Sequence, residues 1–458
     1  MAKIAITAGP TGKQVAVIGG GWAGCTAAVE LAAAGCSVTL FEAARTLGGR
    51  ARGVEVRGRM LDNGQHILLG AYTGTFRLLR RVGVDPNAAL LNLPLQMRYP
   101  DGSGGMDFIA PRLPAPLHLA VALLRAKGLG LADKLALARF SSTARWMVWQ
   151  LNIDCSVAEL LDRFDQPARL VQLMWRPLCL AALNTPPEVA SAKVFLAVLR
   201  DSLGANRAAS DMLLPRRDLH TLFPAAAAAF IEQRAGAVRC GAKVTNLMRD
   251  GASWRVDATG HAVGGASSAL FDAVVLAVAP PAACTLLAGL PLGDMLARLA
   301  AFAYEPITTC YLQYAPTVRL GLPFYALLDD PARGHWGQFV FDRGQLDGAQ
   351  AGLYAVVVSA SNAAAAQGQA ALAQAIGAQL AALFGRPELA TPAWSQVITE
   401  KRATFACTPG LQRLPTASGL PGLVLAGDHI DSDYPATLET AVRSGVAAAQ
   451  AIIKPASA

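Results

Sequence analysis

Three glycines near the N-terminus, Gly19, Gly21 and Gly24, have the G-x-G-x-x-G spacing of a phosphate-binding turn. Such a turn lets the backbone approach a pyrophosphate closely, and the helix that follows presents free N–H groups to the phosphates. Glu42 stands at the end of the next apolar run. Its carboxylate can accept hydrogen bonds from both hydroxyls of an adenosine ribose. These residues therefore predict a dinucleotide site, and the alternative is a glycine-rich turn with a structural role only.

The sequence around the glycines predicts the elements that must position them. Residues 15–18 form a β-branched apolar run, residues 26–34 have helical spacing and stop at Gly35, and residues 37–41 again suit a strand. A strand, a glycine turn, a helix and a second strand are together typical of one half of a doubly wound parallel sheet. In that fold the strand ends and the helix N-terminus meet at the bound nucleotide.

Length and composition limit the number of domains and the kinds of partner that we expect. Its 458 residues suffice for two domains with a large core. Apolar residues make up 53% and charged residues 16%, with a net charge of +8 and a pI of about 9.2. A basic, apolar chain suits an anionic membrane surface or an acidic partner. Because no helix-turn-helix, zinc-finger or aromatic–basic pattern is present, we do not expect nucleic acid as a partner.

The remaining composition points to a reducing compartment. The eight cysteines form no C-x-x-C pair and the six histidines have no ligand spacing, so we expect buried thiols and no metal. Residues 1–14 lack the apolar core of a signal peptide. The uncharged window 273–293 is interrupted by two prolines, so we expect a strand, a turn and a helix there rather than a membrane span. These features predict a cytoplasmic location.

A basic and apolar segment at 117–151 is the candidate for membrane contact. Leucines alternate there with arginines and lysines, Asp133 is the only acid, and Trp146 and Trp149 stand near the end. A basic amphipathic helix pair with interfacial tryptophans is typical of peripheral membrane binding, here at the inner face of the cytoplasmic membrane. The alternative is a helical cap with a solvated basic face.

Motifs at both ends of the chain resemble the FAD-binding amine oxidase and phytoene desaturase superfamily. Gly48-Gly49-Arg50 continues from Glu42 with the E-x5-G-G-R spacing of that superfamily, and Gly427-Asp428 ends an apolar run before a helix. The resemblance implies non-covalent FAD, with the arginine loop at the pyrophosphate and the last helix directed at the flavin, where its positive end stabilises negative charge. The turn and the resemblance together give the following cofactor-binding candidates: Gly19, Gly21, Trp22, Ala23, Gly24, Glu42, Ala43, Gly48, Gly49, Arg50, Val244, Gly427, Asp428 and Leu438.

The same resemblance implies the architecture. We expect an α/β fold in which a Rossmann-like FAD-binding domain of the glutathione reductase type is interleaved with an α+β substrate domain. Residues 13–85, 220–290 and 404–458 are assigned to the FAD-binding domain. Residues 86–219 and 291–403 are assigned to the substrate domain.

Three more specific stretches resemble the squalene-associated FAD-dependent desaturase family, the hydroxysqualene dehydroxylases of bacterial hopanoid and squalene synthesis. They are D-N-G-Q-H-I-L-L-G-A-Y at 62–72, N-T-P-P-E at 184–188 and A-G-D-H-I-D-S-D-Y-P at 426–435. The resemblance implies a C30 isoprenoid substrate: a hydride from reduced FAD would replace the hydroxyl of hydroxysqualene, giving squalene and water. An electron donor must then reduce the FAD, and NADPH is the candidate.

Loss of the hydroxyl group requires an acid. His66, Asp433 and Tyr434 are the candidates because their motifs border the expected flavin position, although His66 also suits a hydrogen-bonded core histidine. Three other functions stay open: a carotenoid-type phytoene desaturase, an amine oxidase, and a non-enzymatic prenyl carrier or escort protein on the same fold. Nothing in the sequence supports a covalent flavin link through Cys407.

Overall fold

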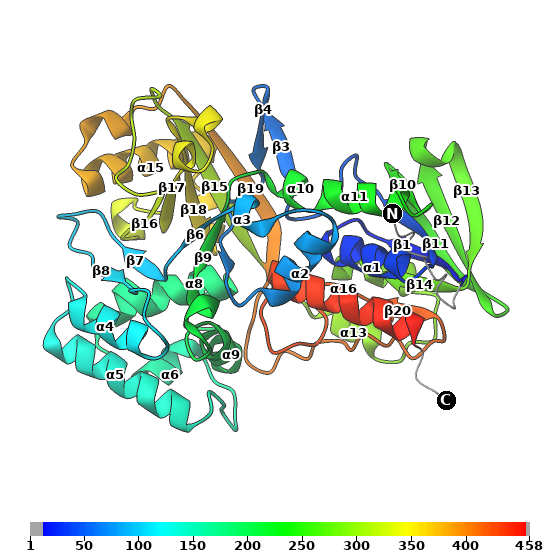
Figure 1. Ribbon diagram of the computed structural model, residues 1–458, viewed down its shortest axis with the longest axis horizontal. Coiled ribbons are helices and arrows are strands. Elements are labelled where there is room, and N and C mark those ends of the chain that lie inside the picture. Colours follow the sequence, from blue (N-terminus) through cyan, green and yellow to red (C-terminus); the bar gives the residue numbers. More distant parts are fainter. Residues whose placement is uncertain (1–11, 455–458) are drawn as a thin grey trace, which may run out of the picture.

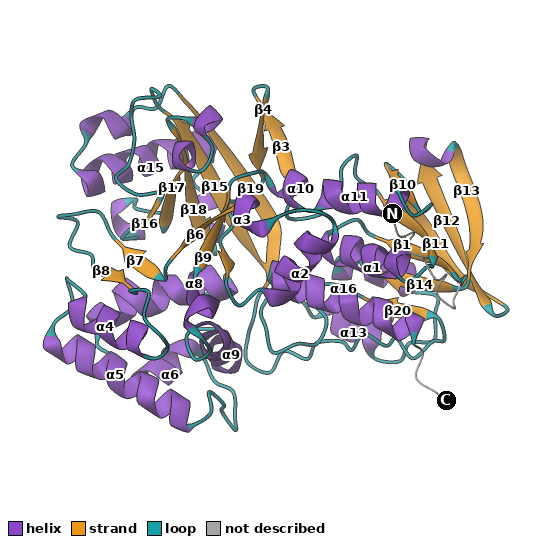
Figure 2. Ribbon diagram, in the orientation of Figure 1, coloured by secondary structure: helices purple, strands orange, loops and turns teal. Residues whose placement is uncertain are grey.

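The computed structural model of the chain describes residues 12–454. Residues 1–11, where no signal sequence is expected, and residues 455–458, at the end of the expected FAD-binding domain, lie outside that range. The described chain has two parts side by side, each built around a five-stranded sheet, and a layer of helices lies beneath the sheet at the left of the view (Figures 1 and 2).

The sheet at the right of Figure 1 is parallel, and β1 (Gln14–Ile18) lies at its centre. Its strands come from the three stretches that the sequence assigns to the FAD-binding domain, and their order is β10-β2-β1-β14-β20. The strands other than β1 are β2 (Ser37–Glu42), β10 (Ala237–Cys240), β14 (Ala273–Leu276) and β20 (Leu423–Leu425). The expected α/β class is therefore confirmed.

Successive side chains of β1 point to opposite faces of the sheet and pack into two different hydrophobic cores. Val15 and Val17 pack toward the helices on one face, whereas Ala16 and Ile18 pack toward a small antiparallel sheet on the other. The helices of the first face are α1 (Trp22–Ala33), α11 (Pro224–Glu232) and α16 (Leu438–Ile453). The elements of the second face are β11 (Lys243–Asp250), β12 (Ser253–Gly260), β13 (Gly265–Phe271), α12 (Pro280–Leu287) and α13 (Met295–Ala300).

The second five-stranded sheet is antiparallel, with the order β16-β17-β18-β15-β19. One face packs against α15 (Gln369–Phe384), and the other belongs to the core that it shares with the helical layer. Its strands are β15 (Tyr304–Gln313), β16 (Phe324–Ala326), β17 (Phe339–Asp342), β18 (Leu353–Ser359) and β19 (Trp394–Phe405).

The helical layer contains the segment 117–151. The expected helix pair is present as α4 (Leu117–Arg125) and α5 (Leu131–Trp146), and beyond its end Val148 and Trp149 have positive φ values of 54° and 56°. Phe140, Trp175 and Phe195 form the aromatic centre of this layer. Its helices are α4 (Leu117–Arg125), α5 (Leu131–Trp146), α6 (Val157–Arg163), α7 (Ala168–Leu170), α8 (Arg176–Leu183) and α9 (Ala192–Ser202).

Short elements connect the two parts. A three-stranded sheet with the order β5-β9-β6 joins residues that the sequence places in different domains, because β9 (Met212–Pro215) pairs with both β5 (Leu68–Leu69) and β6 (Leu90–Leu93). The other connecting elements are β3 (Gly53–Val56), β4 (Arg59–Asp62), α2 (Thr73–Arg81), α3 (Pro86–Ala89), β7 (Gln96–Arg98), β8 (Asp107–Ile109) and α10 (Leu219–Leu222).

The uncharged window 273–293 folds as the strand β14 followed by the helix α12, as the sequence predicts. Among the helices within residues 12–454, none is both long enough and apolar enough to cross a bilayer.

Candidate functional site

A cavity of about 450 Å³ lies at the carboxyl ends of the parallel strands, where they face the second sheet. Glu42, the last residue of β2, lines it, and Val278 and Asp428 line it just beyond the ends of β14 and β20. Ile307 and Val357 come from the second sheet. In open α/β sheets a ligand binds in this position, outside the carboxyl ends of the strands. We call it the cofactor cavity.

The three glycines of the turn have different roles. A Cβ atom on Gly24 would lie 1.8 Å from the carbonyl oxygen of Gly19, so Gly24 allows α1 to approach the turn. Gly19 has a φ of 104°, which favours glycine. Gly21 has an ordinary φ of −72° and precedes α1 without a side-chain cap. Its Cβ would meet only the Cα of Gly49, at 3.9 Å. The uncapped N–H groups of α1 are therefore available to an anion.

Glu42 is held by backbone hydrogen bonds at both carboxylate oxygens. The N–H of Gly20 donates to Oε2 at 2.7 Å, and the N–H of Ala44 donates to Oε1 at 2.7 Å. A carboxylate oxygen can accept more than one hydrogen bond, so Glu42 can still accept from ribose hydroxyls. The turn and Glu42 together fit the adenosine diphosphate half of a dinucleotide.

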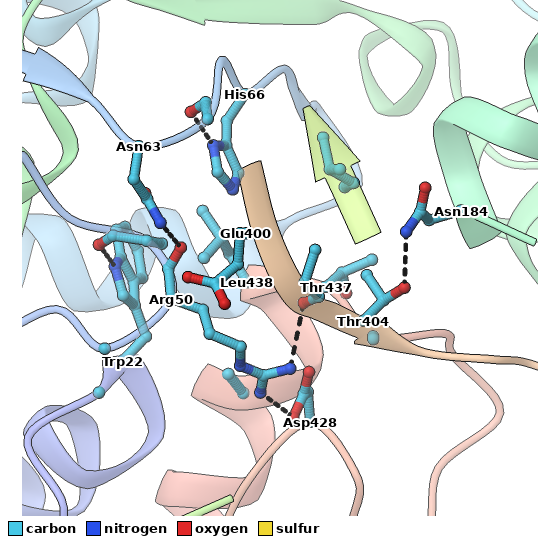
Figure 3. A pocket seen from close by; sticks show the side chains of 18 of the residues that line it. Trp22, Arg50, Asn63, His66, Asn184, Glu400, Thr404, Asp428, Thr437 and Leu438 are labelled. Carbon is cyan, nitrogen blue, oxygen red and sulfur yellow. Dashed lines mark hydrogen bonds and ion pairs between the residues drawn. The ribbon is translucent and has the colours of Figure 1, made fainter. Parts of the chain in front are cut away.

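The motifs from the two ends of the chain meet in this cavity. Arg50 Nη2 lies 2.5 Å from Asp428 Oδ1, and Arg50 Nη1 donates to the carbonyl of Ala403 at 3.1 Å (Figure 3). Burial acts to raise the pKa of Asp428, but the charge and hydrogen bond of Arg50 together with the neighbouring His429 outweigh it and hold that pKa well below its usual range. Asp428 is therefore ionised, and it fixes the arginine loop against the end of β20.

The arginine loop is also supported from the 62–72 stretch and from α1. Asn63 Nδ2 donates to the carbonyl of Arg50 at 2.8 Å, and Asn63 Oδ1 accepts from the N–H of Arg52 at 3.2 Å. Trp22 Nε1 donates to the carbonyl of Ala51 at 3.2 Å (Figure 3). Sequence reasoning did not assign a role to Asn63, although the stretch containing it was singled out.

The N-terminus of α16 faces the cavity. Thr437 caps the helix by accepting a hydrogen bond from the N–H of Thr440 at 3.2 Å, and Thr437 and Leu438 both line the cavity. Ser444 Oγ accepts from the N–H of Gly427 at 2.9 Å, which ties the helix to the Gly-Asp motif. The positive end of the helix dipole is therefore directed at whatever occupies the cavity.

Most of the predicted cofactor residues line this cavity. The exceptions are Gly24, which packs behind the turn, Ala43, which is exposed, and Val244, which is buried in β11. The adenine contact expected at Val244 stays a prediction. The predicted residues that line the cavity are Gly19, Gly21, Trp22, Ala23, Glu42, Gly48, Gly49, Arg50, Gly427, Asp428 and Leu438. Glu400 of β19 also lines it, close to Arg50 in Figure 3, and was missed because its strand carries no motif.

The three predicted acids are not brought together. His66 lines the cofactor cavity, where Nδ1 lies 2.7 Å from the carbonyl of Gly64, and burial lowers the pKa of its imidazole. Tyr434 is buried beneath the Arg443 guanidinium, 4.6 Å from its ring centroid, and lines a second cavity.

Asp433 lines neither cavity. Its side chain is 73% exposed and lies 3.6 Å from Arg200. The physical reason is the buried Arg413, whose Nη1 binds the carbonyls of both Ser432 and Tyr434. With the flanking carbonyls held inward, the Asp433 carboxylate lies in solvent.

The second cavity, which we call the apolar cavity, has a volume of about 540 Å³ and adjoins the first. Leucine, methionine and aromatic side chains of the helical layer form most of its wall. Residues that line both cavities are Ile67, Tyr72, Ala181, Ala182, Phe339 and Thr437. This junction could not be predicted from the sequence, because its members come from four separate parts of the chain.

The N-T-P-P stretch connects two layers of the structure, and its Asn184 also lines the cofactor cavity. Asn184 adopts the left-handed conformation at the end of α8, with a φ of 47°. Its amide donates to Thr404 Oγ1 at 3.0 Å and accepts from the N–H of Ala360 at 2.7 Å. Thr185 Oγ1 accepts from the N–H of Cys407 at 3.0 Å. These bonds hold the helical layer to the second sheet beside the cofactor cavity.

Cys407 is buried in the shared core and does not line the cofactor cavity. Within residues 12–454, no cluster of histidine, cysteine, aspartate and glutamate side chains could hold a metal ion.

Comparison with known families decides which class of protein this geometry belongs to. The family model for flavin-containing amine oxidoreductases matches residues 22–453. The chain belongs to this family. Its cofactor is therefore a flavin and the chain is an oxidoreductase, which removes the non-enzymatic carrier from the open alternatives.

Two relatives match this chain over almost its whole length. A hydroxysqualene dehydroxylase of Rhodopseudomonas palustris is 30% identical over 96% of the chain and 98% of that protein. A second, from Sinorhizobium fredii, is 29% identical over 95% of the chain and 97% of that protein. The resemblance stated from the motifs is confirmed by these relatives.

Solved structures show the same fold. A putative protoporphyrinogen oxidase from Exiguobacterium superposes with a TM-score of 0.67 at 17% identity, covering 97% of this chain and 99% of that one. A putrescine oxidase triple mutant superposes with a TM-score of 0.72 at 17% identity, covering 96% and 98%. The expected fold, a nucleotide-binding domain combined with a substrate domain, is thereby confirmed.

Proposed function

We propose that this flavoenzyme is an FAD-dependent dehydroxylase that converts hydroxysqualene into squalene and water. The observation that supports it best is the large apolar cavity that adjoins the cofactor cavity and shares part of its wall. A cavity of about 540 Å³ with few polar groups suits a long hydrocarbon chain. The two relatives that match over nearly their full length are hydroxysqualene dehydroxylases, which supports hydroxysqualene as the substrate.

The cofactor proposed is FAD, held without a covalent bond. Glu42 would bind the adenosine ribose, Gly21 and the start of α1 the pyrophosphate, and Arg50 with Asp428 would support the chain that leads to the flavin. Reduced flavin supplies a hydride when it is bound. Cys407 is not placed to form a covalent link. We propose NADPH as the donor that reduces the flavin, to be tested by anaerobic bleaching of the protein with NADPH against NADH.

The chain itself provides an apolar and electrostatically prepared environment for the reaction. Ile307, Phe341 and Val357 present apolar surface of the second sheet to the cofactor cavity and exclude water from it. The N-terminus of α16 would stabilise negative charge on a reduced flavin bound in the cavity. Both effects favour hydride transfer to an electron-poor allylic carbon.

The acid needed to remove the hydroxyl cannot be Asp433 in this arrangement, because its carboxylate lies in solvent. His66 stays a candidate for substrate contact, but with its lowered pKa it is neutral near pH 7 and accepts rather than donates through its free nitrogen. Tyr434 carries a hydroxyl group and lines the apolar cavity, so it stays a candidate proton donor.

Substrate entry from a membrane is part of the proposal. Leu124, Ala138 and Arg145 are exposed and also line the apolar cavity, so the cavity reaches the surface at α4 and α5. The same surface exposes large apolar side chains beside basic ones. Its exposed apolar residues are Leu117 (56%), Leu124 (74%), Leu131 (74%), Leu135 (62%) and Trp146 (84%). Trp149, expected at the membrane, is instead half-buried and lines the cavity.

A vesicle assay tests the membrane contact. The double variant Leu131→Glu, Leu135→Glu changes two exposed leucines that do not line the cavity, and it should lose most of its sedimentation with anionic vesicles. Leu270→Glu is the matched control, because Leu270 is 52% exposed on β13, far from this surface in Figure 1. Equal sedimentation of the double variant and the wild type would remove the proposed surface.

The reaction is tested by product analysis under two redox conditions. Protein reduced with dithionite under anaerobic conditions should convert hydroxysqualene into squalene, and oxidised protein should leave phytoene unchanged. A desaturase would give the opposite pattern, with phytoene desaturated by oxidised protein and hydroxysqualene left intact. An amine oxidase would act on neither and would oxidise an amine.

A further inference from the structure

We infer that Tyr72 binds the hydroxyl group that leaves the substrate and gives it a proton; the inference rests on the proposed dehydroxylation. Tyr72 lines both cavities, so its side chain stands where a substrate in the apolar cavity must approach the cofactor. Among the six residues that line both, only Tyr72 and Thr437 carry a hydroxyl group. The others, which include Ile67 and Phe339, are apolar.

A buried network fixes the position of Tyr72. It is the N-cap residue of α2, directly before the N-terminal turn. Glu439, in the first turn of α16, is fully buried. It accepts hydrogen bonds from the N–H of Gly74 at 3.0 Å, the N–H of Thr75 at 2.8 Å and Thr75 Oγ1 at 2.7 Å. The two helix N-termini are therefore joined, and the backbone that directly follows Tyr72 is held in place.

The phenol keeps its proton in this environment. Burial raises the pKa of Tyr72 well above its usual range, the carboxylate of Glu439 adds to that effect, and a hydrogen bond with Thr437 opposes it. At physiological pH Tyr72 is therefore a hydrogen-bond donor. Phenolate is nevertheless a weaker base than hydroxide, since the pKa of bulk water is about 15.7, so proton transfer to a departing hydroxide is favourable.

The step balances with one proton from Tyr72. The C–O bond of the alcohol breaks with its electron pair on oxygen, the carbon receives the hydride, and the oxygen receives the phenol proton to become water. Tyr72 then recovers a proton from solvent. The alcohol is reduced to a hydrocarbon by the two electrons that the reduced flavin brings.

The same hydrogen bond distinguishes an alcohol from a hydrocarbon. A site built to bind a hydroxyl group discriminates strongly against an analogue that lacks it, because its buried donor is then left unpaired. Tyr72 thus favours binding of the hydroxylated substrate and release of the hydrocarbon product.

The variant Tyr72→Phe in the flavin-loaded protein tests the inference. It should lower kcat/KM for hydroxysqualene by on the order of a hundredfold or more, the usual contribution of a positioned acid. Flavin content and the flavin absorbance spectrum should match the wild type, and squalene should inhibit the variant more strongly because no donor is left unpaired. Tyr325→Phe is the matched control, because Tyr325 is half-buried and lines neither cavity.

Two results would overturn the assignment to Tyr72. One is wild-type turnover by Tyr72→Phe, and the other is loss of turnover in Tyr434→Phe alone, which would assign the acid to Tyr434. Failure of the wild type to convert hydroxysqualene would instead count against the proposed function. In that case the preference for a C30 alcohol over squalene, measured from perturbation of the flavin spectrum, still tests Tyr72: it should disappear in Tyr72→Phe, and its persistence would refute the inference.

Discussion

Replacing Gly21 by alanine should separate cofactor binding from folding. Gly21 has φ and ψ of −72° and 178°, which alanine adopts freely, and its Cβ would contact only Gly49, at 3.9 Å. The substitution should therefore leave the fold intact, because the gain of about 0.4–1 kcal/mol from a less flexible unfolded chain is opposed by the preference for glycine over alanine at the N-cap. The added methyl group would stand in the cofactor cavity before the N-terminus of α1.

The expected loss of affinity follows from the hydrogen bonds at the turn. Displacing the pyrophosphate by the width of a methyl group would cost one hydrogen bond to a charged group, worth about 1.5–3 kcal/mol. Since about 1.4 kcal/mol corresponds to a tenfold change in Kd, the Kd for FAD should rise by roughly ten- to a hundredfold. The neighbouring Gly24→Ala should instead lower the stability of the apoprotein.

Gly24→Ala places a Cβ 1.8 Å from the Gly19 carbonyl oxygen, so α1 would have to move away from the turn. Overpacking of this kind costs about 1–3 kcal/mol and sometimes more. Urea unfolding of the deflavinated proteins and calorimetric titration with FAD measure the two effects separately. If Gly21→Ala bound FAD as tightly as the wild type, the pyrophosphate would not lie at this turn, and the assignment of the cavity would be wrong.

Three further predictions concern the same part of the molecule. Arg50→Ala leaves the buried Asp428 carboxylate without its cation, so urea unfolding should show a loss of about 2–3 kcal/mol, below the roughly 3–5 kcal/mol of a fully buried pair because Arg50 is 33% exposed. As a control, Arg163→Ala breaks the exposed ion pair with Glu159, and it should lower the free energy of unfolding by less than about 1 kcal/mol. Burial raises the pKa of Asp62 to about 7, so the folded state binds a proton more tightly than the unfolded state, and this contribution to stability is full below about pH 4 and is lost as pH rises toward 7. The stability of the wild type relative to Asp62→Asn should fall over that range, and a flat difference would contradict the shift. Acid precipitation should release all of the flavin into the supernatant, and flavin retained in the pellet would indicate a covalent bond, at Cys407 or elsewhere.

The nucleotide half of the site could be predicted from residue types alone. Glycine spacing, a β-branched strand before it and an acid after the next strand each have a local physical cause, and each of these elements is present. The meeting of Arg50 with Asp428 could not be derived locally, since the two are separated by most of the chain. It was expected only because both motifs resemble one superfamily.

The substrate side was less predictable because it depends on contacts between distant segments. The two-residue strand at 68–69 pairs with 212–213, and no local pattern specifies so short a strand. Tyr72 belongs to a stretch that the sequence singled out, but its position depends on Glu439 in the last helix. Asp433 shows the converse error, because its motif borders the cofactor while Arg413 holds the neighbouring carbonyls and leaves its side chain in solvent.

A single anaerobic turnover tests the central claim most directly. The protein would be reduced with dithionite, freed of excess reductant and mixed with hydroxysqualene, while flavin absorbance and extracted products are followed together. The account predicts that the oxidised flavin spectrum returns as an equal amount of squalene forms. Reduced flavin that persists with hydroxysqualene present, and no squalene, would contradict it.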